Sequence, residues 1–170
     1  MTRAHILFLT AAILFGLEAT PGLSAQSVDV IVQFVHPEKF TDFSIYGRDY
    51  RWSTSYFAGE ISRDLRPELK RKFPGSKLTL RFTDVDLAGS YRTSSRGGSG
   101  VRVTRGERAP ARMSFDFLLE DRAGRTLASG STRITDASHH SPVTRPQTGS
   151  GPLYYEKRML KRWFISVEAS

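Results

Sequence analysis

Two aspartates at the end of an alternating strand pattern come closest to a chemical motif in this sequence. Asp84 and Asp86 lie two residues apart in the segment 77–89, KLTLRFTDVDLAG. On a continuing strand they would project from one face and could ligate a divalent cation or share a proton. Two carboxylates alone are too few oxygens for a calcium site. We therefore favour a structural role, in which they accept backbone hydrogen bonds and pair with arginines such as Arg81 or Arg92.

A histidine cluster offers a second set of groups that could bind a metal. Asp136, His139 and His140 form a D-x-x-H-H run. Adjacent histidines on an extended segment point apart, however, and no H-E-x-x-H motif accompanies them. The sequence also contains no G-x-S-x-G elbow and no glycine-rich phosphate loop in the required context. We therefore assign no catalytic residue, no metal ligand and no cofactor.

Aromatic and basic residues share the predicted C-terminal helix 153–167. Its apolar positions fall along one side, as in a helix that packs on a core. Such a helix can bind a membrane surface or a partner. Alternatively it docks on the core, its Lys and Arg face water and Glu156 pairs with a base one turn on, which we favour. The candidate binding residues from the whole sequence are Asp84, Asp86, Arg81, Tyr155, Lys157 and Arg158.

The elements that position these residues follow from hydrophobic periodicity. Residues 28–35, VDVIVQFV, alternate as a strand. From Ser53 to Phe73 apolar residues recur every four positions, which indicates an amphipathic helix, with a kink or restart near Arg66 because Pro67 removes a hydrogen bond. The strand beginning at Lys77 completes a strand–helix–strand crossover, so we expect the first two strands to be parallel.

The second half of the chain predicts a hairpin and a terminal helix. Residues 113–119 and 126–135 form its strands around the turn Asp121–Gly124. Residues 101–103 are at most a short edge strand, and flexible loops are expected near 92–110 and 137–152. The prediction is one α+β domain, with a mixed or antiparallel sheet of four to five strands and two helices on one face, in the order β-α-β-β-β-α.

The N-terminus reads as a cleaved secretory signal peptide, residues 1–25. Arg3 precedes an apolar run from Ile6 to Leu17, and a breaker and small residues lead to Ala25. The run is short for a membrane span, so a retained anchor is the less favoured alternative. Residues 26–170 then form a single domain with no transmembrane span. The chain has no cysteine and hence no disulfide or lipidated cysteine. We expect a periplasmic or otherwise exported protein.

Charge points to anionic partners. The 170-residue chain has a formal net charge of +8, which is unchanged when the predicted signal peptide is removed. In an exported protein these partners would be envelope polyanions before nucleic acid. The arginines are scattered along the chain, so the charge does not by itself define a binding stripe. The aromatic-rich loop 38–54 can contact a ligand or cover the edge of the core.

Four ordered motifs carry a resemblance to a known family. They are FVHPEKFTDF at 34–43, FTDVDLAG at 82–89, LASG at 127–130 and LYYEKRMLKRWF at 153–164. In this combination the chain resembles the DUF3016 family of exported bacterial proteins of unknown function. The resemblance implies a periplasmic or envelope-associated setting and supplies no catalytic residue.

The functional hypothesis is a non-enzymatic exported binding or accessory protein that engages an anionic envelope component or a protein partner. The alternative is a metal-dependent hydrolase that uses Asp84, Asp86, His139 and His140. Nucleic-acid binding outside the cytoplasm would depend on charge alone, and no specific nucleic acid is expected.

Overall fold

A computed structural model describes residues 29–92, 101–103, 110–136 and 151–169. The predicted signal peptide, and most of the predicted loops near 92–110 and 137–152, lie outside these residues. The elements are β1 (Val30–Phe34), η1 (Pro37–Lys39), α1 (Tyr50–Lys72), β2 (Lys77–Asp86), β3 (Ser90–Arg92), β4 (Val101–Val103), β5 (Arg112–Glu120), β6 (Thr126–Thr135) and α2 (Tyr154–Ser166). No described helix is long and apolar enough to cross a membrane.

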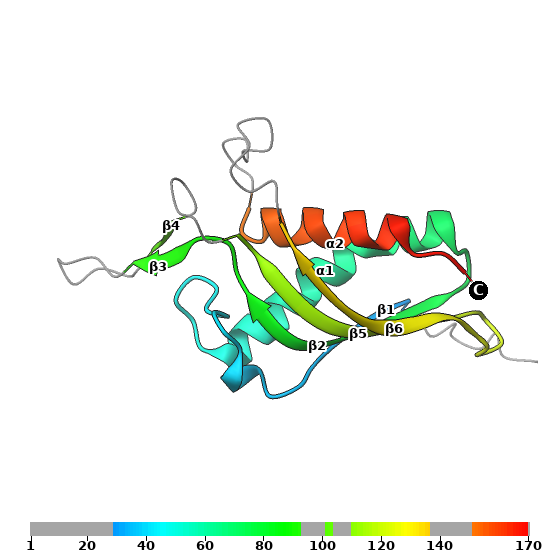
Figure 1. Cartoon of the computed structure of the whole chain (residues 1–170), viewed down its shortest axis with the longest axis horizontal. Coiled ribbons are helices and arrows are strands. Elements are labelled where there is room, and N and C mark those ends of the chain that lie inside the picture. The colour runs from blue at the N-terminus through cyan, green and yellow to red at the C-terminus, as the bar shows by residue number, and fades with distance from the viewer. Residues whose placement is uncertain (1–28, 93–100, 104–109, 137–150, 170) are drawn as a thin grey trace, which may run out of the picture.

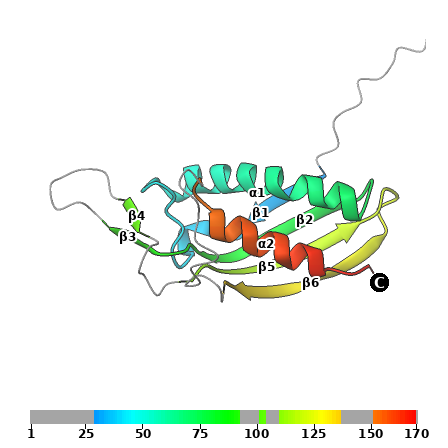
Figure 2. The same cartoon turned by 90° about the horizontal axis from the view of Figure 1, so that it is seen from above.

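The main sheet has four strands in the order β1-β2-β5-β6 (Figures 1 and 2). β1 and β2 are parallel, as the crossover through α1 predicts, and the pairs β2–β5 and β5–β6 are antiparallel. β3 and β4 form a separate two-stranded sheet at one end of the molecule. The predicted α+β fold with a mixed sheet is confirmed, and so is the hairpin of β5 and β6.

Both helices pack on the same face of the sheet. Phe82 of β2 and Phe115 of β5 are opposite each other in the register and are both buried. The ring of Phe57 in α1 lies 5.2 Å from that of Phe82, and the ring of Trp163 in α2 lies 4.8 Å from that of Phe115. Aromatic contacts of this geometry bury large apolar areas, so this layer forms the centre of the core.

A β-bulge in β2 decides which way its two aspartates point. Leu78, Leu80 and Phe82 are buried, but after the register shift between Phe82 and Asp84 the buried position moves to Val85. The extra residue is Thr83, which has no partner on β5. Without it, the alternation of a strand would turn both aspartates toward the apolar core. The bulge therefore keeps Asp84 and Asp86 on the face away from the helices.

Helix α1 begins earlier than predicted and is not interrupted. The carboxylate of Asp49 accepts a hydrogen bond from Trp52 N at 2.9 Å and caps the helix, so its first residue is Tyr50 rather than Ser53. Of the kink or restart predicted near Arg66, the restart is wrong, because α1 continues through Pro67 to Lys72. Pro67 lies on the exposed side, while buried residues before and after it, Leu65 and Leu69, hold both halves against the core.

Candidate functional site

Asp84 has a structural role on the open face of the sheet. Its Oδ1 accepts a hydrogen bond from Thr41 N at 2.9 Å, and its Oδ2 accepts one from the Thr41 hydroxyl at 3.0 Å. Both carboxylate oxygens are thus used to hold the segment that follows η1. Asp84 therefore accepts a backbone hydrogen bond, as we expected from the sequence, and the donor is Thr41.

Replacing Asp84 with alanine should lower the free energy of unfolding by about 1.5 to 3 kcal/mol, because two hydrogen bonds to a charged group are lost. Asp84→Asn keeps an acceptor for Thr41 N and should lose less. Chemical denaturation of the two variants and the wild type, with and without added Mg²⁺, Ca²⁺ or Zn²⁺, measures both effects. A metal-dependent stabilisation of the wild type that Asp84→Ala abolishes would instead support a metal site.

Asp86 and Arg81 do not form the pair that the sequence suggested. Asp86 lies 3.6 Å from Arg112, and Arg81 lies 3.6 Å from Asp116. The expected pairing of Arg81 with the two aspartates is therefore wrong, because cross-strand neighbours on β5 provide the opposite charges. Burial raises the pKa of Asp86, although Arg112 opposes the shift.

A metal centre is not evident in the described part of the chain. No group of three or more His, Cys, Asp or Glu side chains there could hold a metal ion. His139 and His140, which the hydrolase hypothesis requires, lie outside the described residues.

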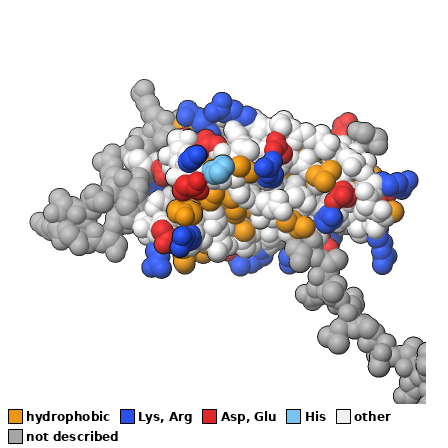
Figure 3. Space-filling model, turned by 90° about the horizontal axis from the view of Figure 1, so that it is seen from below, with side chains coloured by type: hydrophobic (Ala, Val, Ile, Leu, Met, Phe, Trp, Pro, Cys, Tyr) orange, Lys and Arg blue, Asp and Glu red, His pale blue; other side chains and the backbone are white. Residues whose placement is uncertain are grey.

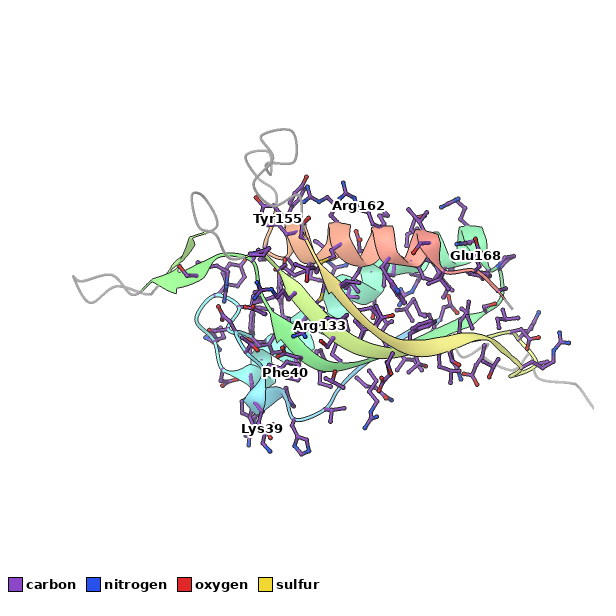
Figure 4. The ribbon with its side chains drawn as sticks, viewed as in Figure 1. Lys39, Phe40, Arg133, Tyr155, Arg162 and Glu168 are labelled. Atoms are coloured by element: carbon purple, nitrogen blue, oxygen red, sulfur yellow. The ribbon has the colours of Figure 1, made fainter. Side chains whose placement is uncertain are left out.

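The candidates on α2 hold the helix in place. Tyr155 is buried near the beginning of α2 (Figure 4). Lys157 Nζ donates to Glu60 of α1 at 2.9 Å and thereby lowers the pKa of that carboxyl, and Arg158 donates to Asp136 at 2.6 Å. The prediction that these bases face water is therefore wrong. They lie on the helix-covered side of the sheet, so the structure does not bring them together with Arg81, Asp84 and Asp86.

A partly buried arginine that sequence reasoning missed joins several segments. Arg102 of β4 makes two hydrogen bonds to the carboxylate of Asp42, at 2.6 and 3.0 Å. Its guanidinium also donates to four backbone carbonyls, at 3.2 to 3.4 Å, which belong to Ser44, Leu87, Ala88 and Gly89. A planar guanidinium with five N–H groups suits such a site. Arg102 therefore connects the small sheet to the loop before α1 and to the end of β2.

A buried carboxylate lies beside this connection. Glu156 is 3% exposed, and its Oε1 accepts a hydrogen bond from Ala88 N at 2.8 Å. The expected pairing of Glu156 with a base one turn on is wrong, because the side chain points into the protein. Burial raises its pKa, while the hydrogen bond from Ala88 and the charge of Arg102 oppose the shift.

The raised pKa of Glu156 predicts a specific pH dependence. The folded state binds this proton more tightly than the unfolded state, so the contribution of Glu156 to stability falls as pH rises from about 4.5 through the folded pKa. Glu156→Gln keeps the acceptor for Ala88 N but cannot ionise. We expect the stability of Glu156→Gln relative to the wild type to increase with pH, as measured by urea denaturation from pH 4.5 to 8. A difference that is constant with pH would contradict this assignment.

The described surface also carries an aromatic cluster with exposed cations. The aromatic–arginine surface consists of Tyr46, Arg48, Tyr50, Arg51, Trp52 and Tyr56. The rings of Trp52 and Tyr56 stack at 4.9 Å, and Tyr46 meets both edge-on at about 6 Å. Tyr46 and Tyr50 are 59% and 38% exposed. Trp52 and Tyr56 are partly buried and pack against the core, whereas Tyr46 and Tyr50 face solvent beside them.

The conformation and electrostatics of this surface are distinctive. Tyr46 has a φ of 53°, in the left-handed region that residues other than glycine rarely adopt. Arg48 lies 5.6 Å from the ring centre of Trp52, and Arg51 lies 5.8 Å from that of Tyr50. Neither arginine forms an ion pair with a described carboxylate, and the nearby Asp49 caps α1 instead. The cations are thus available to an external anion.

Many cations on the rest of the described surface lie beside carboxylates. On the face shown in Figure 3, basic and acidic side chains lie beside one another, and hydrophobic side chains form only small groups. Several described cations elsewhere are neutralised by carboxylates, including Lys77 by Glu120 at 2.7 Å and Lys161 by Glu68 at 3.1 Å. The net charge is therefore less informative than the location of the cations that have no acidic partner.

The fold and site define an α+β protein with a four-stranded mixed sheet, a partly buried polar connection at one end and an aromatic–arginine surface. The profile of the family described as "Protein of unknown function (DUF3016)" matches residues 28–166, and the chain belongs to this family. No curated protein and no solved structure matches the chain.

Proposed function

We propose that this protein is an exported, non-enzymatic binding protein that engages an anionic polymer of the cell envelope through the aromatic–arginine surface. The observation that carries the proposal is a group of packed rings, of which Tyr46 and Tyr50 are exposed, beside Arg48 and Arg51, which have no carboxylate partner among the described residues. Export follows from the predicted signal peptide, residues 1–25.

An acidic polysaccharide is the class of polymer that suits this surface. Sugar rings have apolar C–H faces that can pack on Trp52 and Tyr46, while the guanidinium groups can pair with carboxylates along the chain. Rings already packed against one another lose little conformational freedom on binding. The overall charge of +8 attracts the polymer at long range, and this attraction weakens when salt shortens the screening length to about 8 Å at 0.15 M.

Binding of polygalacturonate to the chain lacking residues 1–25, measured by calorimetry at two salt concentrations, tests the proposal. Trp52→Ala and the double variant Arg48→Ala/Arg51→Ala should each weaken binding about tenfold, or about 1.4 kcal/mol. A matched control is Arg66→Ala/Arg122→Ala, which removes the same charge at exposed positions without ion pairs to described residues. Dextran tests the need for anionic groups, and polyphosphate tests the need for sugar rings.

The control variant distinguishes binding at the aromatic–arginine surface from attraction by the overall charge of the protein. If both double variants weaken binding equally and Trp52→Ala has no effect, the protein attracts polyanions without using this surface. Equal binding of polyphosphate and polygalacturonate would exclude a role for the sugar rings. N-terminal sequencing of protein from the cell envelope tests export, and we expect it to begin near Gln26.

A further inference from the structure

β6 is a long edge strand of the main sheet. One side of the strand pairs with β5 through all of its ten residues except Leu127, and no described strand pairs with the other side. β1, at the opposite edge, has only five residues. An edge strand presents a row of backbone donors and acceptors, which can pair with a strand from another chain.

From Ala128 to Thr135 this edge has little of the usual protection against pairing, and the irregularity at Leu127 affects only the beginning of the strand. Monomeric proteins commonly interrupt or charge such strands with proline, lysine or inward-pointing charges. The sequence of β6, TLASGSTRIT, contains no proline and no lysine, and Arg133 is its only charged residue. Its central residues Ser129, Gly130 and Ser131 are exposed. No described residue blocks this part of the strand, and it is almost neutral.

We propose that a second copy of this chain occupies the edge. β6 would pair antiparallel with β6 of the partner about a two-fold axis and join the two four-stranded sheets into one continuous sheet. Each face must remain continuous, so residues that face the helices must oppose residues that also face the helices. Ala128, Gly130, Thr132 and Ile134 share the helix-covered face, since they oppose the core residues of β5.

A register centred on Ser131 meets this requirement. Ser131 then opposes the partner's Ser131, and Arg133 opposes the partner's Ser129, so like charges are not directly opposite. A register centred one residue earlier would place two Gly130 residues opposite each other and provide less side-chain contact. In the register that we propose, Ile134 opposes the partner's Ala128, which leaves room for its larger side chain.

A shallow groove beside β6 favours the same partner. The groove lies between β6 and α2, and the apolar side chains of Ile134, Met159 and Trp163 contribute to its lining. Arg162, labelled in Figure 4, and Asp136 also line it. In the dimer, Ile134 at the edge of each groove would lie beside the partner's Ala128 on the helix-covered face. The apolar linings of the grooves would then be less exposed to water, which favours association.

The dimer would present two aromatic–arginine surfaces. These lie at the beginning of α1, which packs on β1 at the edge opposite β6. Both surfaces would remain accessible, and one polymer chain that reached both would bind with increased avidity. This consequence depends on the proposed function, whereas the dimer itself does not.

Single cysteines test the pairing directly, because the natural chain contains none. Directly opposed residues in antiparallel strands are close enough for a disulfide. Under mild oxidation, Ser131→Cys should form a covalent dimer rapidly. Gln33→Cys, an exposed position on β1, is the matched control and should cross-link slowly. Rapid cross-linking of Gln33→Cys, or equal rates for both variants, would overturn the proposal.

Sedimentation velocity without cysteine gives an independent result. The chain lacking residues 1–25 should be dimeric at micromolar concentration, and Ser131→Lys should raise the dimer dissociation constant about tenfold or more, since it places two cations opposite each other. Gln33→Lys should have no effect. A wild type that remains monomeric at 100 µM would overturn the dimer whether or not polysaccharide binds. A dimer with no sensitivity to Ser131→Lys, in a variant that melts cooperatively, would place the interface elsewhere.

Discussion

Phe82→Ala is expected to lower the free energy of unfolding by about 3 to 5 kcal/mol, as is typical when a buried phenylalanine is truncated. Phe82 is fully buried in the centre of β2. Its ring lies 5.8 Å from Phe34, 5.2 Å from Phe57 and 5.2 Å from Phe115, so it joins three elements. The truncation would leave a cavity, and β1, α1 and β5 would all have to move to close it. Urea denaturation followed by tryptophan fluorescence measures the change.

Arg81→Ala is the matched control for this prediction. Arg81 precedes Phe82 in the same strand but lies on the open face, where it is exposed and 3.6 Å from Asp116. Exposed ion pairs contribute about 0 to 1 kcal/mol, so the control should be close to the wild type. A loss below about 1 kcal/mol for Phe82→Ala would mean that β2 does not present Phe82 to the core.

The elements of this fold could be predicted because their periodicity is local. The spacing of four between Phe57, Ile61, Leu65 and Leu69 belongs to a helix with one buried face, and all four are buried in α1. The alternation in β2 and β5 likewise identified their buried faces. The strand–helix–strand connection then predicted the parallel pairing of β1 and β2. Strand order was not predictable in this way, since β2 and β5 are neighbours across a long intervening segment.

The bulge in β2 shows where the sequence pattern was insufficient. Two aspartates after an alternating strand could mean a metal site, a turn or a register change. The spacing of Asp84 and Asp86 in the sequence is compatible with all three. The structure resolves the ambiguity through Thr83, the extra residue, which turns Asp84 outward to Thr41. Thr41 is distant in the chain, so no local pattern could have identified it.

The polar residues were hardest to interpret, because charge does not indicate a partner. Lys157 and Arg158 were expected at the surface, but carboxylates from α1 and from the end of β6 pair with them. Glu156 comes directly before them in the sequence and points into the core instead. Gly89, whose carbonyl accepts a hydrogen bond from Arg102, has a positive φ, which glycine adopts without steric cost. Arg102 itself lies beside a glycine- and serine-rich segment and resembled a linker residue.

Arg102→Ala is expected to lower the free energy of unfolding by about 3 kcal/mol, the lower end of the range for breaking a buried ion pair. The side chains of Arg102 and Asp42 are 16% and 30% exposed, so solvent screens the pair in part. The variant would leave the Asp42 carboxylate and the carbonyls of Ser44, Leu87 and Ala88 without their donor. Thermal and chemical denaturation of the variant measure the loss.

A double-mutant cycle separates the value of this connection from the cost of breaking it. The Nε of Arg102 is buried without a hydrogen-bond partner, so the pair also carries a desolvation penalty. Arg102→Ala/Asp42→Asn removes the unpaired carboxylate and should recover part of the stability lost in Arg102→Ala. Arg102→Lys keeps the charge but not the planar guanidinium and should recover less than half of it, since one ammonium cannot reach Asp42 and the carbonyls together. Full recovery by Arg102→Lys would show that charge alone, and not the geometry of the guanidinium, joins β4 to the rest of the protein.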